Sequence, residues 1–113
     1  MNIENILKKH LLWLNQEDGG ERADLSGANL SGANLIGADL IGANLNDAKT
    51  SSPIIVFNGP QHQAIYCQGY VRIGCQYHSL KDWVEQYEAI GKEAQYSADE
   101  IRLYGDWLMR IKS

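Results

Sequence analysis

The 113-residue sequence predicts a single α+β domain, and three observations lead to that prediction. A five-residue period runs from Ala23 to Ala48, which fits neither the 3.6-residue period of a helix nor the two-residue period of a strand. Apolar residues recur at helical spacing near both ends of the chain. Runs rich in β-branched and aromatic residues lie between them. We therefore expect four successive parts: a capping helix in 1–20, a repeat coil in 21–52, a small antiparallel sheet in 53–78 and a helical pair in 79–113.

The first helix is expected over residues 3–15. Asn2 can cap its start, and Gly19-Gly20 can supply the backbone conformations that end it. Trp13 lies beside the apolar stripe. The stripe itself consists of Ile3, Ile6, Leu7, His10, Leu11 and Leu14. We expect this helix to cover the open end of the repeat coil.

The repeat consists of the units ADLSG, ANLSG, ANLIG, ADLIG and ANLND, and Ala48 opens a sixth unit that is not completed. The central Leu of each unit must point to a common interior. The Ala two positions earlier should point there too, because only a small side chain fits beside the Leu. Gly and Asn tolerate repeated tight turns, so the remaining positions should form the corners and the outer surface.

Three strands are expected after Pro53, where the composition changes. They cover residues 54–57, 64–67 and 70–75, with Gln68-Gly69 as a turn between the last two. We expect them to form an antiparallel sheet.

Two capped helices should complete the chain. Ser79 precedes an acidic residue at position 82, and Ser97 precedes Glu100, so both segments have the pattern of a capping box. The first helix has its apolar residues at Leu80, Trp83, Val84, Tyr87 and Ile90. The second has them at Ile101, Tyr104, Leu108 and Ile111, with Leu103 and Trp107 alongside. Trp13, Trp83 and Trp107, one per helix, are read as core residues rather than base-stacking platforms, because no basic residues are interleaved with them.

The tandem A(D/N)LxG-like units resemble the pentapeptide-repeat family. The resemblance implies a short right-handed quadrilateral β-helix, in which four units make one coil and Leu25 stacks on Leu45 at about 4.8 Å. Five units give barely more than one coil, so the coil must be supported by the rest of the chain. Segments 7–23, 71–80 and 91–104 further resemble proteins of phage and prophage origin that carry short pentapeptide blocks, a class to which we attach no activity.

Composition restricts the function classes. Apolar residues make up 44% and charged residues 21%, as in ordinary globular proteins, and the net charge of −4 argues against direct nucleic-acid binding. We expect no signal peptide, and the sequence has no apolar run that could span a membrane. We therefore expect a cytoplasmic protein, in the host cell if phage-encoded, in which Cys67 and Cys75 are reduced.

Ile36 and Ile41 occupy the repeat position after the central Leu, which faces outward and is otherwise Ser or Asn. Adjacent outward apolar residues are either covered by a flanking helix or form an interface. Asp24 and Asp39 are the acidic members of the Asp/Asn ladder, which resembles the repeats of proteins that imitate DNA. One coil is too short for rod-like mimicry, but these four residues remain our candidate partner or dimer interface.

His62, Cys67, Cys75 and His78 are types of residue that ligate zinc or form a thiol nucleophile. Their spacing is not that of a known finger, and buried structural cysteines are common. The sequence has no catalytic triad signature and no phosphate-binding loop, so we predict no catalytic, cofactor or metal residues.

We therefore expect a non-enzymatic, phage-type protein-binding module without a cofactor. Its expected partner is a host protein, such as a nucleic-acid-binding effector of a defence system, which it would inhibit in the manner of an anti-CRISPR protein, with partial DNA mimicry. Two alternatives stay open: an assembly module that acts as a homodimer, and a protein with a Cys/His zinc or thiol site. The sequence identifies neither the partner nor the oligomeric state.

Overall fold

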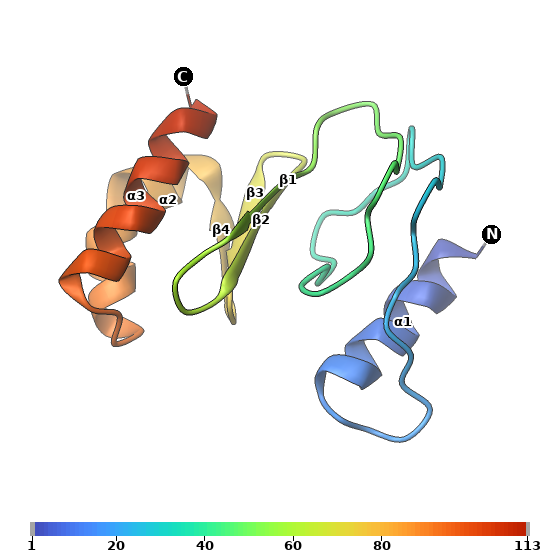
Figure 1. The fold of residues 1–113 in the computed structure, drawn as a ribbon. Helices are drawn as coiled ribbons and strands as arrows, with labels where there is room; N and C mark the ends of the chain where they lie inside the picture. The colour runs from blue at the N-terminus through green and yellow to red at the C-terminus, as the bar shows by residue number, and fades with distance from the viewer. Residues whose placement is uncertain (1, 113) are drawn as a thin grey trace. The chain divides into compact units, whose positions relative to one another are not determined.

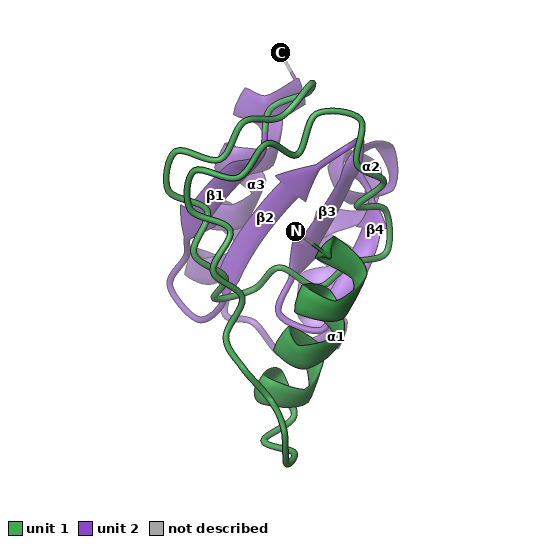
Figure 2. Cartoon of the chain, turned by 90° about the vertical axis from the view of Figure 1, so that its right-hand side faces the viewer, with its two compact units in different colours: residues 1–53 green, residues 54–113 purple. Residues whose placement is uncertain are grey.

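The computed structural model describes residues 2–112, and its residue contacts divide the chain into two compact units, 1–53 and 54–113 (Figures 1 and 2). We predicted one domain over 1–113, and the boundary between the units falls at Pro53, where the composition changes. Each unit is described separately below. No helix among the described residues is both long and apolar enough to cross a membrane.

The first unit begins with helix α1 (Ile3–Leu14). The side chain of Asn2 accepts a hydrogen bond from the Asn5 amide at 3.0 Å, which confirms the predicted cap. His10 is fully buried, whereas Leu11 is 49% exposed, so the predicted apolar stripe is wrong at Leu11. After the helix, Gly20 passes so close to α1 that a Cβ there would lie 2.4 Å from the Trp13 backbone nitrogen.

Each five-residue unit of the repeat turns one corner. From Ala28 to Ala48, the amide of the Ala that opens a unit donates to the carbonyl of the preceding Leu, as from Ala33 to Leu30 at 3.0 Å. The residue before that Ala has positive φ: it is Gly in the first four units, as at Gly32 (φ 80°), and Asp47 (φ 60°) in the fifth. This is the type II turn, which needs a left-handed residue at its third position. Six of the predicted interior residues are buried: Ala23, Leu25, Ala28, Leu30, Leu35 and Leu40. The others are half-buried, including Leu45 and the Ala residues of the last three units.

The repeat chain returns alongside itself after twenty residues. Asp24 pairs with Asn44, and Asn29 pairs with Lys49, both in parallel. The Leu25 amide donates to the Asn44 carbonyl at 2.8 Å. These are isolated bridges, so residues 21–52 contain no regular strand and do not show the predicted β-helix.

The second unit contains a four-stranded antiparallel sheet in the order β1-β2-β3-β4. Its strands are β1 (Ile55–Asn58), β2 (Gln63–Cys67), β3 (Tyr70–Ile73) and β4 (Gln76–Ser79). The prediction of three strands was wrong, because the run 70–75 ends at Ile73 and the chain turns at Gly74, which has φ 58°. The following residues pair back onto β3 as a fourth strand, with Ile73 opposite Gln76.

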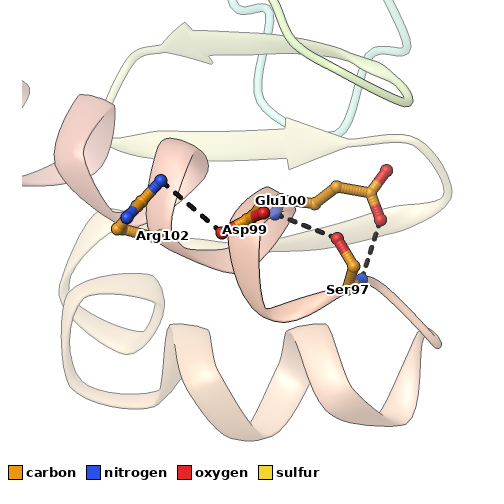
Figure 3. A network of polar contacts seen from close by, with 4 residues as sticks. All are labelled: Ser97, Asp99, Glu100 and Arg102. Atoms are coloured by element: carbon orange, nitrogen blue, oxygen red, sulfur yellow. Dashed lines mark hydrogen bonds and ion pairs between the residues drawn. The ribbon is translucent and has the colours of Figure 1, made fainter.

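Helices α2 (Leu80–Glu93) and α3 (Ala98–Lys112) lie together on one face of this sheet (Figure 1). Both predicted caps are present. The Ser79 hydroxyl accepts from the Asp82 amide, and Ser97 and Glu100 exchange hydrogen bonds of 2.7 and 3.2 Å (Figure 3). The core between the helices and the sheet consists of Ala64, Val71, Ile73, Trp83, Ile90, Tyr96, Ile101, Tyr104, Trp107 and Leu108. The α+β class is therefore confirmed.

Candidate functional site

Asp24 and Asp39 act first as parts of the backbone turns. The Oδ1 atom of Asp24 accepts from the Ser26 amide at 3.1 Å and from the Ser26 hydroxyl at 2.6 Å. Asp39 accepts from the Ile41 amide at 3.0 Å, and Asn29, Asn34 and Asn44 make the same bond to the residue two positions on. The predicted Asp/Asn ladder is thus a series of Asx turns, which explains why either residue type serves.

The two aspartates differ in what they present outward. Asp24 is exposed, and its bonds from the Ser26 hydroxyl and amide, with a smaller contribution from the Arg22 charge, lower its pKa. Asp39 is half-buried. Asp24 is therefore an exposed carboxylate whose position is fixed by its two hydrogen bonds from Ser26.

Ile36 and Ile41 do not form an equivalent outward pair. Ile36 is 54% exposed, and its amide is held by the Asn34 side chain at 3.1 Å. Ile41 is half-buried, and its carbonyl oxygen lies 2.7 Å from the Nε2 atom of His10. Helix α1 therefore contacts the backbone of Ile41, and Ile36 is the exposed member of the pair.

His10 connects helix α1 to the coil at two places. Its Nδ1 atom accepts the Ala23 amide at 3.0 Å, so the ring proton lies on Nε2 and is donated to the Ile41 carbonyl. The ring also stacks on Trp13, at 5.4 Å between centroids. In the sequence, His10 stands within an apolar stripe. A polar residue at such a position was the only indication that His10 forms buried hydrogen bonds.

Further contacts hold the same helix against the repeat. A Cβ on Gly42 would lie 3.3 Å from the Trp13 ring, so the ring covers this glycine corner. From α1, the Lys9 ammonium group lies 3.8 Å from the Glu21 carboxylate. Within residues 21–52, the Arg22 side chain donates to the Gly42 carbonyl. Helix α1 therefore packs against the coil next to Ala23 and Gly42, and its coverage of the open end of the coil stays a prediction.

The structure separates the four Cys and His residues. His62 and Cys75 lie at the end of the sheet where β2 begins and β3 ends, and a Cβ on Gly74 would lie 3.1 Å from the His62 ring. Cys67 and His78 lie at the opposite end, on opposite faces, because their strand partners are Tyr70 and Val71. No group of three possible metal ligands occurs among the described residues.

The two cysteines lie in different surroundings. Burial raises the pKa of the Cys67 thiol, which disfavours the reactive thiolate. Cys75 is exposed in the β3–β4 turn. His78 contacts the Trp83 ring edge-on, at 5.3 Å between centroids. The positions of these four Cys and His residues do not form the zinc site that was one of our alternatives.

A tyrosine network not foreseen from the sequence fixes the β1–β2 loop. The Tyr104 hydroxyl accepts the His62 amide at 2.7 Å and donates to the His62 carbonyl at 2.6 Å. The His62 Nδ1 atom lies 2.8 Å from the Tyr96 hydroxyl. Burial, followed by the neighbouring Tyr104, Cys75 and Glu100 groups, raises the pKa of Tyr96 to about 12. The network therefore anchors the loop through the hydroxyl groups of two tyrosines.

Trp83 and Trp107 are buried, which confirms them as core residues. The indole nitrogen of Trp83 donates to the Val71 carbonyl at 2.8 Å. The prediction that Trp13 is a core residue is wrong, because its side chain is 41% exposed; its ring packs against His10 and Gly42.

Residues 21–49 match the family model described as pentapeptide repeats (8 copies). The match confirms the resemblance inferred from the A(D/N)LxG units, for this part of the chain. The searches of curated proteins and of solved structures returned no match.

Proposed function

We propose, starting from the pentapeptide repeats of residues 21–49, that the chain is a non-enzymatic protein-binding module whose contact surface is centred on Ile36. The observation that carries the proposal is the 54% exposure of this isoleucine at a corner whose backbone is fixed. Serine occupies the same repeat position at Ser26 and Ser31. An aliphatic side chain held at a rigid surface loses little entropy on binding, which favours a role in recognition.

In this proposal, the repeat segment forms one coil of a right-handed quadrilateral β-helix. The parallel pairing of Asp24 with Asn44 and of Asn29 with Lys49 supports it, since the offset equals four repeat units. The buried Leu25, Leu30, Leu35 and Leu40 are consistent with four sides facing one interior.

The proposed partner is a host protein with a basic surface, such as a nucleic-acid-binding effector of a defence system that the phage-type module inhibits. Residues 1–53 carry seven acidic residues against four basic ones. One of these seven, Asp24, is an exposed carboxylate with a lowered pKa. Charge complementarity of this kind speeds encounter and selects the partner, while the apolar Ile36 contributes buried area.

Site-specific photocrosslinking in host cells tests the proposal. A photoreactive phenylalanine analogue replaces Ile36 in one variant and Ser31, the exposed residue one unit earlier, in the control. We expect a discrete adduct from position 36, identified by mass spectrometry as one host protein, and little from position 31. The absence of an adduct, or equal adducts from both positions, would contradict the proposal.

The exposure of Ile36 also favours a second function, an assembly module that dimerises through this residue. An adduct that contains two copies of the chain, together with a dimer mass in light scattering, would support it. The substitution Ile36→Asn should then give a monomer, whereas Ser31→Asn should not change the mass.

A further inference from the structure

A groove lies on the second unit, between the beginning of α2 and the end of α3. Its lining residues are Leu80, Lys81, Val84, Glu85 and Lys112, and its volume is about 340 Å³. This volume lies at the lower end of the range of about 300–1,000 Å³ that small-molecule sites occupy. All five lining residues belong to the second unit.

The floor of the groove is aliphatic. Leu80 and Val84 are four residues apart on α2, so their side chains lie next to each other on one face of the helix. Both are half-buried, and both pack against the core of the unit. They offer a fixed apolar surface large enough for a short hydrocarbon chain.

Two ammonium groups border this floor. Lys81 and Lys112 are exposed, and within residues 2–112 neither forms an ion pair. Glu85 is the single acidic residue of the lining, so the lining carries a net positive charge in a chain that is acidic overall. The positive end of the α2 dipole lies at the same place.

We infer that this groove binds a small aliphatic carboxylate, whose hydrocarbon chain covers Leu80 and Val84 while its carboxylate lies between Lys81 and Lys112. Hydrogen bonds from an ammonium group to a carboxylate are stronger than those between neutral groups. An aliphatic amine would place a third cation beside the two lysines, and an alcohol would leave them without a counter-charge. The site therefore selects for an anionic head group.

Titration of the ¹⁵N-labelled full chain with hexanoate, hexanol and hexylamine tests this assignment. Hexanoate should shift the amide signals of Lys81, Val84, Glu85 and Lys112 with a dissociation constant on the order of 1 mM. Hexanol should bind at least about fivefold more weakly, and hexylamine should leave these signals unchanged. Equal effects of the three compounds, or no shifts at tens of millimolar hexanoate, would overturn the inference.

Charge reversal of the lysines provides a second test. Lys81→Glu and Lys112→Glu should each weaken hexanoate binding about fivefold or more. Lys92→Glu is the matched control, because Lys92 is exposed on α2 outside the groove and gives the same change in net charge. Equal weakening in all three variants would show a nonspecific charge effect and contradict the site.

A peptide occupant is distinguished in the same titration. The dipeptide acetyl-Glu-Leu-amide carries a carboxylate and an aliphatic side chain on a polypeptide backbone. If it shifts the same four amide signals at lower concentration than hexanoate does, the groove is a peptide-docking surface and the assignment to a small carboxylate is wrong. A weaker effect than that of hexanoate supports the assignment.

Discussion

The imidazole Nε2 atom of His10 lies 2.7 Å from the carbonyl oxygen of Ile41, thirty-one residues further along the chain. The other ring nitrogen accepts the Ala23 amide, so one fully buried side chain satisfies two backbone groups that belong to different turns of the repeat. Helix α1 and the coil are therefore joined by polar contacts as well as by packing.

His10→Ala should destabilise the first unit by about 2–4 kcal/mol, because it leaves a cavity and two buried backbone groups without partners. Hydrogen exchange followed by NMR should show the Ala23 amide exchanging at least about tenfold faster. Lys8→Ala, an exposed change on the same helix, serves as the control and should have little effect. Unchanged exchange at Ala23 in the His10 variant would show that the histidine does not hold the coil.

Gly32→Ala should cost about 1–2 kcal/mol of folding stability, because Gly32 has φ 80°. A Cβ at this position would meet no atom within 4 Å, so the cost comes from the backbone alone. Gly32→Asn should cost less, because Asn tolerates the left-handed region. Chemical denaturation of both variants checks this order, and a larger loss for Asn than for Ala would refute the strain argument.

Tyr104→Phe should destabilise the second unit by about 1–3 kcal/mol, because the His62 amide and carbonyl lose their partner. Tyr87→Phe is the matched control: Tyr87 packs its ring against Gly105, and no hydrogen bond to its hydroxyl occurs among the described residues. Thermal denaturation should rank the Tyr104 variant clearly below the Tyr87 variant. Equal melting temperatures would mean that the loop is held by packing.

The stability of the second unit should fall at high pH because of Tyr96. Its pKa is raised from 10.0 to about 12, so the folded state holds the proton more tightly than the unfolded chain does. The stability that protonated Tyr96 contributes is therefore complete below pH 10 and is lost as the pH rises towards 12. Urea denaturation across this range should show a steeper loss for the wild type than for Tyr96→Phe. Parallel losses in the two proteins would contradict the assignment to Tyr96.

The features that the sequence predicted well are those that form within a few residues. The caps at Asn2, Ser79 and Ser97 each depend on a side chain and an amide three positions apart, so short patterns reveal them. The corners of the repeat are equally local. At each corner an Asp or Asn side chain accepts from the amide two residues later, as Asn34 does from Ile36. The buried positions of the repeat follow from its five-residue period.

The features that the sequence missed depend on distant partners. Strand β4 has no apolar run of its own, and pairing with β3 defines it. The bonds of Tyr104 to His62 span forty-two residues. Ile41 is half-buried and Ile36 is exposed, although both occupy the same position of the repeat. The repeat pattern alone could therefore not distinguish them.

Every corner of the repeat is closed by hydrogen bonds within or next to its own five residues. The coil can therefore change in length by whole five-residue units. An insertion of twenty residues would add a complete circuit and preserve the offset that joins Asp24 to Asn44. An insertion of a single unit would turn the following chain by one side and present every later side chain in a new direction. Duplication within this segment can therefore either lengthen the protein or redirect its surface, depending only on the number of units copied.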